Sequence, residues 1–300
     1  MPDRGHPIIE LNQQLGNQIF QYAFGQELAW RSGQKVSYAW VGVQRSCRLN
    51  EILPNGYTQA SRGEMLAVGR LLGDRSDSTR LKVKLDRLGR RGGRQLSKLG
   101  GWPKYDQESI NSHFKPEMFE HRGRCVLWGF FQSERYFAHV GDDIDRAIQL
   151  PTAAADDVFL GLEHPIVSVS FRRGDYALYD AMLPPSYYDH AVSLMRDRLG
   201  DMSLVTVGDD LDFIELMAER LSKFGPTVVG SSKDRSDVDD LGIIAAADHN
   251  VIANSSFAWW GAWLAERRVH PEHHLVIAPR PWFKDRQDII PDRWITLDWA

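Results

Sequence analysis

The chain has 300 residues, of which 43% are hydrophobic and 25% charged, a composition typical of a globular protein with one or two domains. Its 36 basic and 40 acidic residues give a formal net charge of −4, which argues against a protein dominated by nucleic-acid binding. The two cysteines, Cys47 and Cys125, are too few for a disulfide framework, so we expect a reducing compartment. The polar N-terminus and the lack of a long apolar run predict a cytoplasmic protein without a signal peptide or a membrane span.

The first half of the chain opens with a predicted strand, loop and helix. The strand covers 7–11, and the polar loop that follows contains Gly16, Asn17 and Gln18. Gly16 would let the loop backbone approach a ligand, which the amides of Asn17 and Gln18 could contact. The alternative is that Asn17 only caps the helix. Further strands are expected at 35–40 and 125–131, and a short helix at 143–148.

A strongly basic segment lies between residues 80 and 98, where the chain carries eight basic residues and one acid. Such a run is usually a solvated face of a loop or helix. The other interpretation is contact with an anionic membrane surface or a lipid-diphosphate carrier. In that case the protein would be peripheral at the inner face of the membrane.

The second half alternates between strand and helix patterns. A linker is expected at 151–154, which divides the chain into domains at 1–150 and 151–300. Strands of this domain are predicted at 167–171, 203–207, 227–230, 250–253 and 275–278. Helices are predicted at 185–199, 238–247 and 257–264, and a further one with Ile214, Met217 and Leu221 along one side. This alternation predicts βαβ units and a parallel, doubly wound, Rossmann-like sheet.

Two adjacent arginines follow the first strand of this second domain. Arg172 and Arg173 would lie at the carboxyl end of the strand, where open α/β sheets bind their ligands. A planar guanidinium suits phosphate oxygens and stays charged at physiological pH. The alternative is that both arginines only pair with Asp175 and a neighbouring carboxylate at the surface.

A second polar group follows the strand at 250–253. Asn254, Ser255 and Ser256 open a helix, and hydroxyls and backbone N–H groups at a helix start can bind an anion. An ordinary serine cap is the alternative. Together with the arginines, this group suggests a diphosphate site. Asp209 and Asp210, at a third strand end, could accept hydrogen bonds from a ribose or a base.

Several motifs of other enzyme classes are missing. The sequence has no glycine-rich dinucleotide turn, no P-loop and no G-x-S-x-G serine elbow. The histidines at 270–274 lack a spacing that would put ligands on one helix face, so we expect no metal there.

Six blocks occur in a fixed order between residues 15 and 294, namely 15–23, 129–137, 172–176, 249–264, 277–283 and 290–294. They resemble, in the same order, the motifs of the inverting α-1,2-fucosyltransferases of glycosyltransferase family eleven. An ordered match over most of the chain is far more specific than any single motif.

The resemblance implies a GT-B-like fold, in which two Rossmann-like domains face each other across a cleft and the C-terminal one binds GDP-fucose. It also implies inverting transfer of fucose to the 2-hydroxyl of a galactose unit in an oligosaccharide or lipid-linked glycan, without a metal or another cofactor. On this view Arg172 and Asp175 are the catalytic residues, with Arg172 on the β-phosphate. The expected donor-binding residues are Gly16, Asn17, Gln18, Arg173, Asp209, Asp210, Asn254, Ser255, Ser256 and Phe257.

One position departs from the family pattern, because Ser170 stands where the pattern has a histidine. A serine cannot replace an imidazole as general base near neutral pH. Three explanations remain open: the histidine is not essential, Asp175 or another residue acts as base, or a dissociative mechanism needs little base. Ser170 also leaves room for a catalytically weak glycan- or nucleotide-binding protein, and the motifs do not exclude another linkage or nucleotide sugar.

Overall fold

The computed structural model describes residues 5–41, 46–67, 104–107, 113–174, 176, 181–268, 273–283 and 288–299. The chain divides into two compact units, Met1–Ile148 and Gln149–Ala300, which we call the N-terminal and the C-terminal unit. The sequence places the boundary after residue 150. The basic segment at 80–98 and Asp175 lie outside the described residues.

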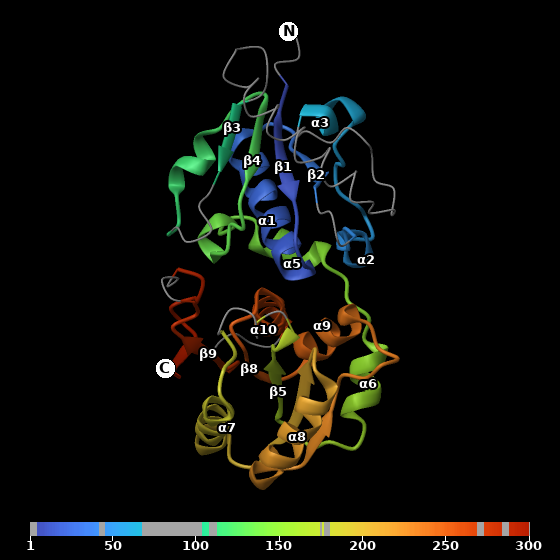
Figure 1. Ribbon diagram of the computed structural model, residues 1–300, viewed down its shortest axis with the longest axis vertical. Helices are drawn as coiled ribbons and strands as arrows, with labels where there is room; N and C mark the ends of the chain where they lie inside the picture. The colour runs from blue at the N-terminus through green and yellow to red at the C-terminus, as the bar shows by residue number, and fades with distance from the viewer. Residues whose placement is uncertain are drawn as a thin grey trace. The chain divides into compact units, whose positions relative to one another are not determined.

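A parallel sheet forms the centre of the N-terminal unit (Figure 1). Its strands are β1 (Pro7–Leu11), β2 (Ser37–Trp40), β3 (Lys104–Gln107) and β4 (Cys125–Trp128), in the order β2-β1-β4-β3. The helices are α1 (Leu15–Ser32), α2 (Leu49–Ile52), α3 (Arg62–Ala67) and α5 (Gly141–Ala147), with short 3₁₀ helices η2 (Pro116–Glu120) and η3 (Glu134–Tyr136).

Helix α1 packs through aromatic side chains. The ring of Phe24, from this helix, stacks on the ring of Phe131, and the two ring centroids are 3.8 Å apart. The helix begins at Leu15, so Asn17 lies within its first turn and the interpretation of Asn17 as the cap is wrong. The predicted strand at 125–131 was too long. It ends at Trp128, and Phe131 has a left-handed φ of 49° that no extended strand allows.

The C-terminal unit contains a second parallel sheet with the order β10-β9-β8-β5-β6-β7. Its strands are β5 (Ile166–Phe171), β6 (Ser203–Gly208), β7 (Thr227–Val229), β8 (His249–Val251), β9 (Val276–Arg280) and β10 (Ile295–Asp298). The helices are α6 (Ala153–Phe159), α7 (Pro185–Leu199), α8 (Leu211–Leu221), η5 (Ser222–Phe224), α9 (Asp237–Ala246) and α10 (Ser256–Arg268). Numbered within the unit, this strand order is the 3-2-1-4-5-6 of a doubly wound Rossmann fold, so the prediction is confirmed.

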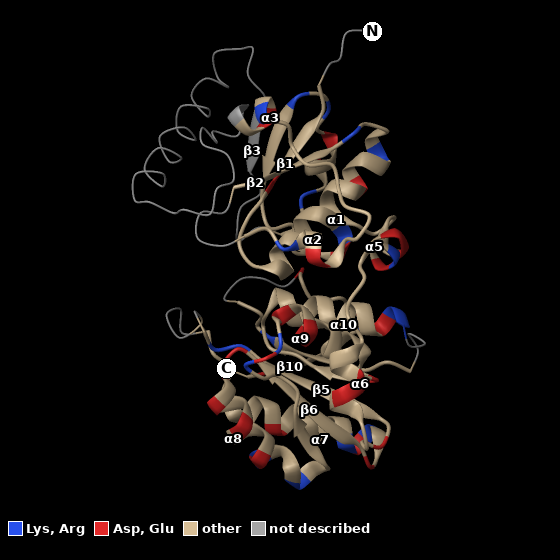
Figure 2. Ribbon diagram, turned by 90° about the vertical axis from the view of Figure 1, so that its right-hand side faces the viewer, with Lys and Arg blue, Asp and Glu red and all other residues tan. Residues whose placement is uncertain are grey.

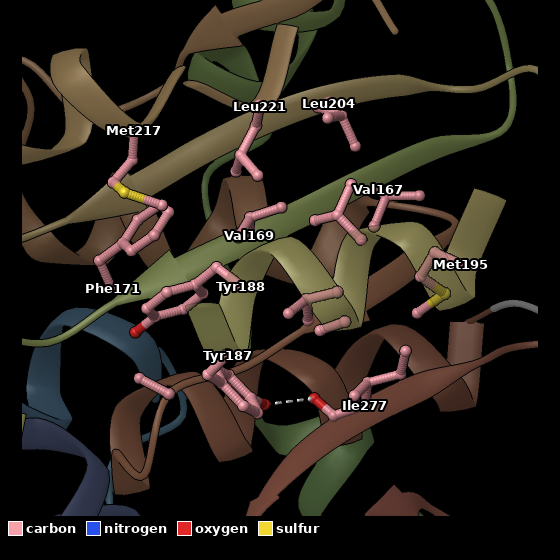
Figure 3. Packing of buried hydrophobic residues seen from close by; sticks show 14 of the residues in the cluster. Val167, Val169, Phe171, Tyr187, Tyr188, Met195, Leu204, Met217, Leu221 and Ile277 are labelled. Atoms are coloured by element: carbon pink, nitrogen blue, oxygen red, sulfur yellow. Dashed lines mark hydrogen bonds between the residues drawn. The ribbon is translucent and has the colours of Figure 1, made fainter. Parts of the chain in front are cut away.

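Helices cover both faces of this sheet. Helices α7 and α8 pack on one face through Tyr187, Tyr188, Ile214 and Met217, against alternate residues of the strands (Figure 3). Helices α6 and α9 cover the other face, and α10 packs on α9. Apolar residues at helical spacing are buried in α8, while its acidic residues, coloured red on the ribbon in Figure 2, are exposed. The tryptophans of α10, Trp259, Trp260 and Trp263, are fully buried.

The expected linker at 151–154 is only partly a linker. Helix α6 begins at Ala153, because the run of alanines there has high helix propensity. Of the expected linker, only Pro151 and Thr152 lie outside α6.

Candidate functional site

The order of strands reverses between β5 and β8 in the C-terminal unit, since the chain leaves β5 toward β6 and later returns to the other side of β5 with β8. Open α/β sheets bind their ligands at the carboxyl ends of the strands beside such a switch point. Arg172 directly follows β5, and Asn254, Ser255 and Ser256 follow β8. The two polar groups predicted from the sequence therefore flank the switch point.

Arg172 is held by a carboxylate from the neighbouring strand. Its Nη1 lies 2.7 Å from Oδ2 of Asp209, and the Arg172 side chain is only 16% exposed. The guanidinium carbon lies 5.3 Å from the ring centroid of Tyr176, a cation–π distance. Asp209 follows β6, so the pair ties the carboxyl ends of two adjacent strands together.

Arg173 points in another direction, toward the start of α8. Its Nε lies 3.2 Å from Oδ2 of Asp210, and its guanidinium carbon lies 4.0 Å from the ring centroid of Phe213. Asp210 also caps α8, because its Oδ1 accepts a hydrogen bond from the Phe213 N–H at 3.2 Å. The backbone N–H of Arg173 donates to Oδ1 of Asp209 at 2.9 Å. The two arginines thus have different surroundings, and Asp209 fixes both residues of the turn.

Gly174 is the next residue of this turn, and a side chain there has no room. A Cβ at Gly174 would lie 2.6 Å from Oδ2 of Asp209, closer than real Cβ atoms come to another heavy atom. The R-R-G segment therefore needs a glycine at its third position for steric reasons, because only a residue without a side chain lets the backbone pass beside the carboxylate that holds Arg172.

The start of α10 is fixed by Asn254. Its Nδ2 donates to the carbonyl oxygens of Ala181 and Trp282 at 3.0 and 3.1 Å. The backbone carbonyl of Asn254 accepts a hydrogen bond from the Tyr176 hydroxyl at 2.9 Å. Asn254 is 1% exposed, and its Oδ1 has no hydrogen-bond partner among the described residues. Because both N–H groups of the Asn254 amide are already donated, only its Oδ1 is available. Asn254 can therefore accept a hydrogen bond from a hydroxyl or N–H group but cannot donate one to a phosphate.

The other residues predicted around this helix start divide into two groups. Ser255 is buried directly before α10, and Ser256 is the first residue of the helix, where backbone N–H groups lack intrahelical partners. Phe257 is half-buried and packs against the apolar cluster under α6 and α9. The helix start can therefore bind an anion through Ser255 and Ser256, whereas the Phe257 ring contributes packing.

Ser170 lies two residues before Arg172, in register with Val207 of β6. It is 3% exposed, and its hydroxyl has no hydrogen-bond partner among the described residues. Within the described ranges, the Ser170 hydroxyl therefore has no hydrogen-bonded group that could activate it.

A further polar contact lies at the carboxyl ends of β6 and β7, and the sequence patterns did not point to it. The Ser231 hydroxyl accepts from the Gly208 N–H at 3.0 Å and donates to Oδ2 of Asp240 at 2.8 Å. Burial raises the pKa of Asp240 to about 6. Asp240 stands in an acidic first turn of α9, which by sequence alone is an ordinary helix start.

The amides predicted in the N-terminal unit hold loops together. Gln18 donates to the Gln13 carbonyl at 2.9 Å and accepts from the Arg48 N–H at 2.8 Å. Oδ1 of Asn17 accepts from Nε2 of Gln132 at 2.6 Å. Gly16 is buried in the first turn of α1. Within this unit these side chains connect the loops that follow β1, β2 and β4.

The described residues contain no group of three or more His, Cys, Asp or Glu side chains placed to hold a metal ion. Of the histidine segment at 270–274, His274 is buried and hydrogen-bonded to Asn250. None of the helices in the described ranges has both the length and the apolar composition to cross a membrane.

Comparison with known proteins adds three relatives. A stretch of 192 residues is 26% identical to the α-1,2-colitosyltransferase of Escherichia coli, covering 59% of this chain and 64% of that protein. A stretch of 138 residues is 30% identical to the O-antigen biosynthesis glycosyltransferase WbnK of Escherichia coli, covering 43% of this chain and 44% of that protein. The matched stretches thus span less than two thirds of either relative.

The third relative is a solved structure, that of a mutant of Arabidopsis thaliana FUT1 in complex with GDP. It superimposes with a TM-score of 0.57 over 96% of this chain and 75% of the other, at 10% identity. At that identity the likeness concerns the fold, which is the GT-B-like fold expected from the sequence. Residues 80–296 match the model of glycosyl transferase family 11. The chain therefore belongs to glycosyl transferase family 11, the fucosyltransferase family.

Proposed function

We propose that this glycosyltransferase moves fucose from GDP-fucose to the 2-hydroxyl of a galactose unit in a glycan, with inversion and formation of an α-1,2 linkage. The observation that carries the proposal is the position of Arg172 at the switch point, beside the start of α10. A mostly buried guanidinium and the N-terminus of a helix are groups that suit a diphosphate leaving group.

The chemistry follows from the charges that develop. The acceptor hydroxyl attacks C1 of fucose from the face opposite the diphosphate, the bond between C1 and the diphosphate oxygen breaks, and the hydroxyl proton is released. The departing GDP gains negative charge, which fixed cations and N–H dipoles stabilise without reorganisation. Arg172 would supply the cation and the α10 start the dipoles. Because both are built into the protein, we propose that the transfer needs no metal.

Asp209 gains a role that differs from the one expected from the sequence. A guanidinium has five N–H donors in a fixed fork, enough to serve a carboxylate and a phosphate together. We therefore propose that Asp209 orients Arg172 toward the β-phosphate. That Asp209 or Asp210 reads the nucleoside stays a prediction.

The activity assay uses the full chain with GDP-fucose and a panel of β-galactosides in the presence of EDTA. We expect GDP release and a product whose fucose is α-1,2-linked by NMR. Arg172→Ala should lower the rate by about 10²-fold or more. Arg198→Ala, which removes an exposed arginine of α7, is the matched control and should keep the wild-type rate. No GDP release with any acceptor would refute the proposal, and a wild-type rate in Arg172→Ala would refute the role of Arg172.

A second donor is favoured by one observation, the similarity to an α-1,2-colitosyltransferase. Colitose is fucose without the 3-hydroxyl, so the two GDP-sugars carry the same diphosphate and differ by one hydrogen-bonding group. Competition between GDP-fucose and GDP-colitose decides between them. A higher kcat/KM for GDP-colitose would make this chain a colitosyltransferase with the same diphosphate site.

A further inference from the structure

Asn12 is a buried amide with no assigned role. It follows β1, is 7% exposed, and neither its Oδ1 nor its Nδ2 has a hydrogen-bond partner among the described residues. Its backbone N–H donates to Oε1 of Gln21 at 2.9 Å. Burying a carboxamide without partners costs free energy, so such a group in a folded protein calls for a physical explanation.

The loop that carries Asn12 is held in one conformation. The next residue, Gln13, has a left-handed φ of 66°, which is uncommon for a residue other than glycine. Two glutamines of α1 fix this arrangement: Gln18 donates to the Gln13 carbonyl, and Gln21 donates to the Gly129 carbonyl after β4 at 2.9 Å. Backbone strain held by surrounding contacts is typical of ligand-binding positions.

Two aromatic rings lie at the same end of the adjacent strand. Trp128 and Phe130 are both partly exposed, and their ring centroids are 6.2 Å apart. Because Ile8 of β1 is in register with Val126 of β4, the alternation of side chains puts Trp128 on the face shared by Ile8 and Val126. Asn12 and Phe130 follow these two neighbouring strands, and Gln21 links the two loops, because it accepts from the Asn12 N–H and donates to the Gly129 carbonyl.

Among the described residues, the side chains that connect the loops at this end of the sheet are amides, and the buried Glu10 of β1, two residues before Asn12, adds an acidic group and no cation. Arg48, on the loop after β2, is paired with Glu51 at 2.7 and 2.5 Å. A diphosphate needs cations, as at Arg172, whereas neutral amides suit hydroxyl groups. A carboxamide both donates and accepts, which matches a sugar hydroxyl, and partly exposed aromatic rings beside a few placed polar groups are typical of a binding site for a small molecule.

We propose that Asn12, together with Trp128 and Phe130, binds a sugar unit of the acceptor glycan, with the Asn12 carboxamide hydrogen-bonded to one of its hydroxyls. The inference rests on the proposed function, since it assumes a glycan acceptor. It assigns the acceptor contact to the N-terminal unit and leaves the diphosphate contacts in the C-terminal unit. The donor sugar also carries hydroxyls, and the experiment distinguishes the two sources.

The test compares Asn12→Ala and Asn12→Asp with the wild type, using the β-galactoside that the wild type fucosylates best from a panel that includes lactose. Three quantities are measured: KM for that galactoside, Kd for GDP by calorimetry, and the thermal unfolding midpoint. Asn55→Ala, at an exposed asparagine of the same unit, is the matched control. Trp128→Ala is compared in the same way with Trp30→Ala, at a tryptophan that is 57% exposed.

We expect KM for the galactoside to rise at least tenfold in Asn12→Ala and Trp128→Ala, with Kd for GDP within twofold of the wild type. The unfolding midpoint of Asn12→Ala should not fall, because the removed carboxamide has no hydrogen-bond partner in the part of the chain that the structure describes. Asn12→Asp keeps the shape but loses both N–H donors, so it should also raise KM.

An unchanged KM in both Asn12 variants overturns the inference. A weaker GDP affinity with an unchanged galactoside KM would assign Asn12 to the donor and overturn it as well. A lowered unfolding midpoint with an unchanged KM would make Asn12 a structural residue. These failures differ from failure of the proposed function, in which the wild type itself would release no GDP from GDP-fucose with any acceptor.

Discussion

Oδ2 of Asp209 lies 2.7 Å from Nη1 of Arg172, while Oδ1 of the same carboxylate accepts the backbone N–H of Arg173 at 2.9 Å. One side chain from the end of β6 thus fixes both the guanidinium and the backbone of the turn after β5. Because Arg172 is oriented by a charge-assisted contact before any ligand binds, diphosphate binding need not order it.

Replacing Asp209 with asparagine should slow transfer although Asp209 is not assigned to the reaction itself. Asparagine keeps an acceptor for the Arg173 N–H but removes the negative charge opposite Arg172, so we expect kcat/KM to fall by about 10-fold to 100-fold, a loss of a few kcal/mol in transition-state stabilisation. Steady-state kinetics with GDP-fucose measure this. Asp212→Asn, at an exposed aspartate of α8, is the control, and equal effects of the two substitutions would contradict the role of Asp209.

Gly174→Ala should damage the same contact through sterics. The added Cβ would lie 2.6 Å from Oδ2 of Asp209, so either the carboxylate or the turn must move and Arg172 loses its orientation. We expect at least about a tenfold loss of kcat/KM, because small displacements of a positioning contact are costly in catalysis. Gly63→Ala is the control, since a Cβ there meets no atom within 4 Å. Similar activity of both variants would show that the close approach at Gly174 is unimportant.

The sequence predicted the C-terminal unit well, because its strands and helices alternate with strong periodicity and each pattern is local. Helix α7 was predicted at its observed bounds. Local patterns do not predict which loops, distant in the sequence, come into contact in the fold. The pairing of Arg172 with Asp209 joins residues 37 positions apart across two strand ends. The open Oδ1 of Asn254 depends on carbonyls from two distant loops. The start of α1 was misplaced because Gln14, a residue without a strong capping preference, precedes it.

Ser170→Ala tests whether the unusual serine takes part in the reaction. The hydroxyl of Ser170 is buried without a partner among the described residues, so its removal should leave the free energy of unfolding unchanged or raise it by about 1 kcal/mol. If Ser170 is no base, kcat should stay within about threefold of the wild type and the pH–rate profile should keep its shape.

The comparison needs both a stability and a kinetic measurement. Urea unfolding gives the first, and Ser168→Ala is the matched control, because the Ser168 hydroxyl accepts a hydrogen bond from Asn250 at 2.6 Å and its loss should destabilise the protein. A large loss of kcat in Ser170→Ala, together with a displaced pH–rate profile, would make the hydroxyl part of the proton transfer.

His274 should make the stability of the protein depend on pH. Burial, with a smaller contribution from repulsion by His249, lowers the pKa of His274 to about 4, although Asp248 acts in the opposite direction. In the folded protein its Nε2 lies 2.8 Å from Oδ1 of Asn250, and since Nδ2 of Asn250 donates to Ser168 and to the Ile244 carbonyl, Nε2 must carry the proton. His274 is therefore neutral in the folded state, whereas in the unfolded chain it ionises near pH 6.5. Between these two values the unfolded chain binds more protons, so acidification from pH 7 to pH 4 should remove about 3 kcal/mol of stability through this group.

Urea unfolding across that range measures the loss. His274→Gln keeps a donor for Asn250 and should flatten the pH dependence, while His190→Gln, at an exposed histidine of α7, should leave it as in the wild type. Parallel curves for the wild type and His274→Gln would mean that other groups cause the acid sensitivity.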